Sequence, residues 1–111
     1  MACRVVHALT AALEPDPLDP AQVLAGAPQT AARELLDAGA VSIGLWEHTA
    51  GSSTDVEADE VFVVLAGRAT IEVEGGRLLD VGPGDVGVLE AGDRTRWHVH
   101  ETLRKVYVLR G

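Results

Sequence analysis

The chain has 111 residues, a length that suits one domain with a single hydrophobic core. Seventeen acidic residues against nine basic ones give a formal net charge of −8, which argues against nucleic-acid and membrane partners. No apolar run reaches the roughly 20 residues of a transmembrane helix, and the N-terminus lacks the apolar block of a secretory signal. Cys3 is the only cysteine, so we expect a cytoplasmic protein without disulfides and assign the thiol no role.

The first thirty residues differ from the rest because they hold four of the five prolines. Within them, DPAQVLAG predicts one or two helical turns, with Asp19 as N-cap, a proline at the first helical position, Gln22 at the third, and Gly26 closing the end. We expect residues 1–30 to form an arm over a β-barrel of residues 31–111, within a single domain.

From about Val41 onward, short strands alternate with turns. The Val-rich run EVFVVLAG ends at Gly67, ATIEVEGGRLLDV predicts a hairpin with a two-residue turn at Gly75-Gly76, and GPGD and EAGD predict two more turns. In Val61 to Leu65 both faces of the strand are apolar. We therefore predict that one face points into the barrel interior and that another sheet or subunit packs on the other. This spacing of short strands predicts an all-β antiparallel sandwich or barrel.

Two local patterns need a separate interpretation. AARELLDAG, from Ala31 to Gly39, has good helix propensity and a C-cap glycine, so local signals alone predict a helix. GPGDVG has the glycine spacing of a dinucleotide-binding fingerprint, but that motif needs a following helix. A strand and a turn follow here, so we predict a turn at Gly82 to Gly87.

Two blocks resemble the paired motifs of the cupin family. Glu60 precedes Gly67 by seven positions, and Glu90-Ala91-Gly92 is followed by Thr95. In wider sequence, GLWEHTAG, Arg96-Trp97 and LRKVYV are similar to small cupins of the ureidoglycine-aminohydrolase and ethanolamine-utilisation types.

The resemblance spans roughly Asp19 to Leu109. It implies a double-stranded β-helix, the cupin jelly-roll barrel, with about eight or more strands. It also implies that Ala31 to Asp37 is an early strand and not a helix.

The metal-binding positions of the cupin motifs are largely altered. The places of the two histidines hold other residues, either Thr54 and Val56 or, under a longer spacing, Ser53 and Asp55. Thr95 stands at the fourth ligand position, so only Glu60 matches the usual four. One carboxylate cannot hold a transition metal tightly, since such sites need three or four N, O or S ligands. We therefore predict neither a metal site nor another cofactor.

RWHVHE places His98 and His100 on one face of a strand, a common beginning of a metal site. If Thr95 faces the barrel interior, Trp97 and Val99 do so too, and the histidines point outward. We predict an outer-surface pair without a metal. His7 and His48 are isolated in sequence, and we assign them no role.

Glu60 has two interpretations. It is either a half-buried partner of a basic side chain or a ligand or proton acceptor in the barrel mouth. The basic side chains available to it are Arg96, Arg104 and Lys105. As ligand-binding residues we predict Glu60, Thr95, Trp97 and Phe62, with Glu60 the candidate catalytic group. The remaining aromatic residues, Trp46 and Tyr107, are expected to fill the core, and Glu47 and Glu57 are further pocket acids to test.

Two functions agree with this sequence. The first is a metal-poor barrel that binds a small polar or cationic metabolite. The alternative is a cupin enzyme acting on a small nitrogenous or carbonyl compound, with Glu60 as general acid, general base or metal ligand. In either case we expect a homodimer.

Overall fold

The computed structural model describes residues 3–111, which form nine strands and one short 3-10 helix. The elements in chain order are β1 (Glu14–Pro15), η1 (Pro20–Gln22), β2 (Val23–Ala25), β3 (Thr30–Asp37), β4 (Val41–His48), β5 (Gly51–Val56), β6 (Asp59–Val73), β7 (Arg77–Val81), β8 (Val86–Leu89) and β9 (Arg94–Arg110). Every strand pairing is antiparallel. No helix within residues 3–111 is long and apolar enough to cross a membrane.

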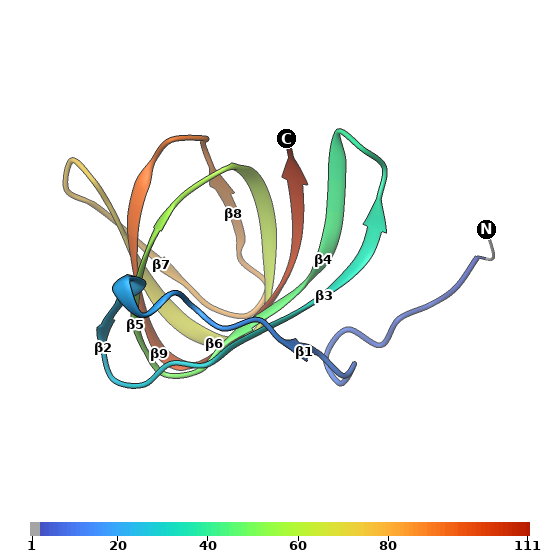
Figure 1. Ribbon diagram of the computed structural model, residues 1–111, viewed down its shortest axis with the longest axis horizontal. Helices are drawn as coiled ribbons and strands as arrows, with labels where there is room; N and C mark the ends of the chain where they lie inside the picture. The colour runs from blue at the N-terminus through green and yellow to red at the C-terminus, as the bar shows by residue number, and fades with distance from the viewer. Residues whose placement is uncertain (1–2) are drawn as a thin grey trace.

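Two long strands, β6 and β9, hold the barrel together by running through both of its halves. The first half of β6 lies between β8 and the second half of β9, which pairs on its other side with β4. The second half of β6 lies between β7 and the first half of β9, which pairs with β5. The strands curl around one interior, as Figure 1 shows. The strand pattern predicted an all-β sandwich or barrel, and this is the jelly-roll barrel that the cupin resemblance implied.

The turn between the two halves lies at Gly67. Its φ is +87°, which a residue with a Cβ rarely adopts, and the β6–β9 register is irregular from Val64 to Ala69. A Cβ on Gly67 would lie 2.0 Å from the carbonyl oxygen of Thr102 on β9. The strand therefore continues through the glycine at which we predicted its end, because the backbones can approach closely there.

The inward faces of β6 and β9 supply most of the core. Phe62, Val64 and Ile71 alternate with more exposed residues along β6, and Trp97 and Leu103 do so along β9. Each side chain points to the opposite face from its neighbour in a strand, so a period of two selects these residues. The interior of the barrel is thus filled by aliphatic and aromatic side chains at its centre.

The N-terminal segment forms one helical turn, the smaller of the two numbers predicted. Asp19 and Gln22 make the predicted capping box around η1, but only three residues are helical. The chain then continues as β2, which pairs with β5, so Gly26 does not end a helix. Arg104 on β9 donates hydrogen bonds to the carbonyl oxygens of Ala8 and Ala11 at 2.9 and 3.0 Å. These bonds hold the segment before β1 against the barrel.

Two local predictions were wrong. The helix predicted locally for Ala31 to Gly39 is the strand β3, because pairing with β4 along most of its length outweighs helix propensity. The hairpin turn contains three residues, Glu74, Gly75 and Gly76, since Val73 pairs with Arg77. Both glycines have positive φ, as predicted.

The turns at GPGD and EAGD are confirmed. Gly84 and Gly92 each have a φ of +88°, and the Asp85 side chain accepts a hydrogen bond from the Gly82 N–H. The strand β8 follows the first turn, so the helix that a dinucleotide site requires is not formed there.

Candidate functional site

A cavity of about 230 Å³ lies at one end of the barrel, next to the aromatic core. Its charged lining is unbalanced, with four carboxylates and one ammonium group. These groups are Asp16, Asp55, Glu57, Glu60 and Lys105. Aromatic and hydroxyl side chains complete much of the wall, namely Trp46, Trp97, Tyr107, Ser53 and Thr54.

Lys105 places its ammonium group inside this lining. Its Nζ donates to Glu60 Oε2 at 2.6 Å, and the two side chains are only 7% and 8% exposed. The same Nζ lies 4.5 Å from the ring centroid of Trp46 and 4.7 Å from those of Phe62 and Trp97. A cation over aromatic faces is stabilised by their quadrupoles, so the cavity already holds one organic cation.

Glu57 is the second buried carboxylate of the cavity. Its Oε2 accepts hydrogen bonds from Thr95 Oγ1 at 2.6 Å and from Trp97 Nε1 at 3.0 Å. Two donors on one oxygen fix the orientation of the Glu57 carboxylate and of the Trp97 ring. The sequence identified Glu57 only as a further pocket acid. It lies in the short connection between β5 and β6, and its side chain lines the cavity.

Asp55 lies where the negative charges meet. Burial raises its pKa, and the neighbouring Glu57 and Glu60 carboxylates raise it further, to about 6, against the opposing effects of the Val56 N–H and Lys105. The ionised form of Asp55 is therefore less favoured than that of an ordinary carboxyl group.

We expect Asp55→Asn to stabilise the protein at pH 7 and to have a smaller effect at pH 4. Because the pKa of Asp55 is raised on folding, its protonated carboxyl group stabilises the folded state. This stabilisation is complete below the pKa of the unfolded chain, near 4, and is lost as the pH rises through about 6. Thermal unfolding from pH 4 to 8 measures the difference between variant and wild type.

Asp59→Asn is the matched control, and we expect it to destabilise the protein at neutral pH, where Asp55→Asn stabilises it. The Ala91 N–H and Arg110 lower the pKa of Asp59, so its charge stabilises the fold at neutral pH and ceases to do so in acid. A difference between Asp55→Asn and wild type that does not grow between pH 4 and 7 would contradict the assignment.

His48 and Ser53 form a buried pair beside the cavity. His48 Nε2 lies 2.9 Å from Ser53 Oγ, and His48 Nδ1 lies 2.6 Å from the Thr49 carbonyl oxygen. His48 is fully buried, and Ser53 lines the cavity with 4% of its surface exposed. Burial, and secondarily Lys105, lower the pKa of His48, which favours neutral imidazole, although its backbone hydrogen bond partly opposes this.

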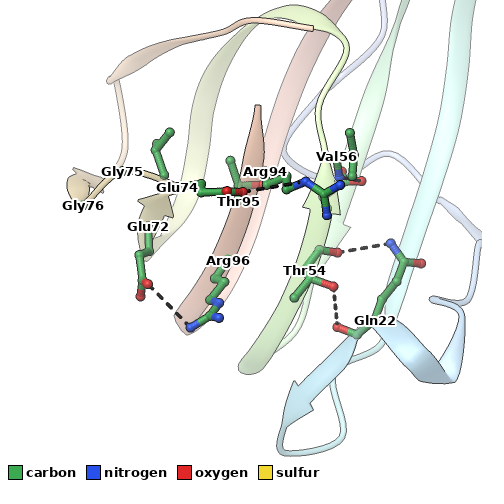
Figure 2. A pocket seen from close by; sticks show the side chains of 12 residues that line it. Gln22, Thr54, Val56, Glu72, Glu74, Gly75, Gly76, Arg94, Thr95 and Arg96 are labelled. Carbon is green, nitrogen blue, oxygen red and sulfur yellow. Dashed lines mark hydrogen bonds and ion pairs between the residues drawn. The ribbon is translucent and has the colours of Figure 1, made fainter. Parts of the chain in front are cut away.

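A larger groove of about 700 Å³ borders the cavity and shares Gln22, Thr54 and Asp55 with it. Figure 2 shows Arg96 directed at Glu72, while Thr54 makes two hydrogen bonds with Gln22. A further ion pair, between Arg94 and Glu74, is largely exposed. Most charges in this groove are paired on its own walls, so it is a weaker candidate for a ligand site than the cavity.

The predicted site residues divide into two groups. Glu60 and Trp97 line the cavity, and Lys105 is the basic partner of Glu60 among those considered. Thr95 donates a hydrogen bond to Glu57 and lines the larger groove, whereas Phe62 packs in the core against Gly87. Whether these four residues bind a ligand remains a prediction.

The other predicted acid and the histidine pair lie outside the cavity. Glu47 forms an ion pair with Arg104, with 3.0 Å between Glu47 Oε2 and Arg104 Nε. His98 lies near Ser52 and Glu72, and His100 lies near Thr70, while Thr95, Trp97 and Val99 are buried. The outward orientation predicted for the two histidines is therefore confirmed.

The residues at the usual cupin ligand positions do not fit a transition metal. Ser53 and Asp55 lie directly opposite the buried, inward-facing Trp97 and Thr95 in the β5–β9 pairing, so they share that face and the longer spacing is the structural one. The donors are then two hydroxyls and two carboxylates, and Glu60 is already bound to Lys105. Among residues 3–111, no three His, Cys, Asp or Glu side chains come together to hold an ion.

A jelly-roll barrel with paired motifs and a cavity at one end defines a small cupin. Residues 35–107, most of the chain, match the EutQ-like cupin domain, and the protein belongs to this family. No curated protein matches the sequence.

Solved structures agree with this fold. The EutQ protein of Clostridium difficile is 18% identical, with a TM-score of 0.68 over 75% of this chain and 68% of that one. Ectoine synthase from P. lautus is 23% identical, with a TM-score of 0.65 over 86% of this chain and 68% of that one. Identities this low show the common fold alone.

A protein of unknown function from Pseudomonas syringae pv. tomato, of the DUF861 family, is 27% identical with a TM-score of 0.79. The match covers 89% of this chain but 44% of that protein. This chain therefore corresponds to less than half of the Pseudomonas protein.

Proposed function

We propose that this cupin binds a small organic cation, such as an amine- or ammonium-bearing metabolite, in the cavity at the end of the barrel. The observation that carries the proposal is the lining itself, in which four carboxylates face a single ammonium group. The rings of Trp46 and Trp97, which line the same cavity, already stabilise one cation, that of Lys105. A positive ligand near Asp55 would offset the mutual repulsion of the acids.

Isothermal titration calorimetry with choline and its uncharged carbon isostere, 3,3-dimethylbutan-1-ol, tests this proposal. We expect choline to bind at least about 10-fold more tightly, which corresponds to about 1.4 kcal/mol. The affinity should rise from pH 5 to pH 7, because Asp55 loses its proton near pH 6. Equal affinity for both compounds, or binding of neither choline nor guanidinium, would refute the cation site.

The enzymatic alternative with Glu60 as general acid or base is less well supported. Glu60 Oε2 is engaged by Lys105 in a buried ion pair, so proton transfer at this oxygen would have to disrupt that pair. The cytoplasmic location also stays a prediction.

We further propose a homodimer formed through an apolar strip on the outside of β6, β8 and β9. This valine face consists of Val61, Val63, Val86, Val88, Val106 and Val108. The strand pairings place these residues side by side, and four of them are 39–68% exposed. A second copy of the same uncharged face suits it, since two such strips bury each other without leaving a charge unpaired.

Val88→Glu should shift the mass measured by light scattering at micromolar concentration from dimer to monomer. The added carboxylate would be buried in the contact, which is costly without a partner. Leu78→Glu is the control, because Leu78 is similarly exposed but lies on β7, outside the valine face. A monomeric wild type would exclude the dimer.

A further inference from the structure

The pair of Ser53 and His48 has the geometry of a nucleophile and its base. The Thr49 carbonyl can only accept a hydrogen bond, so the imidazole nitrogen 2.6 Å from it, Nδ1, must carry a proton. In the neutral ring Nε2 is then an acceptor, and the Ser53 hydroxyl donates to it across 2.9 Å. Hydroxyl, imidazole and an orienting acceptor in this order activate a serine for attack.

The fold supplies this arrangement through a tight connection. His48 ends β4 and Ser53 lies in β5, with the connection turning at Gly51. Both side chains point to the interior, where Ser53 is part of the cavity wall. Ordinary core hydroxyls do not border a space that could admit a substrate, whereas this one does.

Lys105 provides a group that would stabilise negative charge on a reacting oxygen. An ammonium has three N–H donors, and Lys105 makes one hydrogen bond, to Glu60. It lies close enough to His48 to lower the pKa of the imidazole, and it lines the same cavity as Ser53. A carbonyl placed in the cavity would therefore have a cation available for the oxyanion that forms.

We infer that Ser53 is a nucleophile for acyl transfer from small esters, with His48 as its general base and Lys105 as the electrostatic partner of the oxyanion. His48 Nε2 takes the hydroxyl proton as Ser53 Oγ bonds to the carbonyl carbon. The bond from that carbon to the alcohol oxygen then breaks, and the alcohol leaves with the proton from His48.

Hydrolysis completes the cycle. Water attacks the acyl-serine and gives a proton to His48, the acid is released, and Ser53 recovers its proton. One ester and one water yield one carboxylic acid and one alcohol, with no change of oxidation state. We expect Ser53 to prefer esters that carry a positively charged group, and this preference rests on the proposed cation site. The reactivity of Ser53 itself does not depend on that site.

Labelling of the whole chain with phenylmethanesulfonyl fluoride, followed by intact mass and peptide mapping, tests the inference. This neutral reagent does not require the cation site. We expect one sulfonyl group per chain, on Ser53, and a rate of p-nitrophenyl acetate hydrolysis that falls about 100-fold or more in Ser53→Ala.

Ser52→Ala is a matched control, because Ser52 also lies 2.9 Å from a histidine nitrogen, that of His98 on the outer face. It should leave labelling and hydrolysis unchanged. Mapping on the wild type decides the result even if Ser53→Ala fails to fold. Absence of a label, or a label on Ser52, would overturn the inference.

The two proposals fail separately in the wild-type protein. Choline binding without any label on Ser53 would leave the cation site and remove the acyl transfer. A label on Ser53 without choline binding would do the reverse.

Discussion

Lys105→Met is expected to destabilise the protein by about 3–5 kcal/mol, the range for removing one partner of a buried ion pair. The substitution leaves the Glu60 carboxylate 8% exposed and without its 2.6 Å partner. It also removes the cation from the faces of Trp46, Phe62 and Trp97. Urea unfolding at pH 7 measures the change in the free energy of unfolding.

Arg94→Met is the matched control, because its ion pair with Glu74 is 74% and 69% exposed and should contribute only about 0–1 kcal/mol. The double variant Glu60→Gln/Lys105→Met should recover much of the loss, since no buried charge is left unpaired. If Lys105→Met costs no more than Arg94→Met, the ion pair does not hold the barrel end together.

Gly67→Ala should be still more damaging, with a loss of more than about 4 kcal/mol, a size seen only for severe packing or backbone conflicts. Two effects add at this position. The backbone has a φ of +87°, and the new Cβ would lie 2.0 Å from the Thr102 carbonyl oxygen, a backbone atom that cannot turn away. Relief requires β6 and β9 to separate where both strands bend.

Gly76→Ala separates the two effects. Gly76 has a φ of +101° in the β6–β7 turn, but no atom lies within 4 Å of the position of a Cβ. It should cost only the conformational term, about 1–2 kcal/mol. Urea unfolding of both variants, with near-UV circular dichroism as a check of packing, gives the comparison. Equal losses would mean that β6 and β9 separate easily at the bend.

The elements defined by local chemistry were predicted well from the sequence. Positive-φ glycines mark the turns, and alternation along β9 places His98 and His100 outside once Thr95 is inside. β3 was missed by local signals because helix propensity amounts to tenths of a kcal/mol per residue. The pairing of β3 with β4 is set by the whole sheet, and only the family resemblance predicted that strand.

The site was predicted less completely because its contacts join residues far apart in the chain. Glu60 and Lys105 are 45 positions apart, and nothing local distinguishes Lys105 from Arg96 or Arg104 as the partner. Strand parity offered a clue, since Lys105 lies eight residues from Trp97 and so shares its face. For His48 and Ser53, the available signal was the short sequence HTAGS between two predicted strands. A tight connection there brings the end of β4 close to β5.

The central position of β9 constrains when the barrel can form during synthesis. Residues 94–110 are the common partner of β4, β5 and β6, which do not pair with one another. Until this segment is available, β4, β5 and β6 can pair only with β3, β2, β7 and β8, and these separate groups of strands cannot close into one barrel. Closure is thus a late, long-range event, as in other β-rich chains dominated by distant contacts.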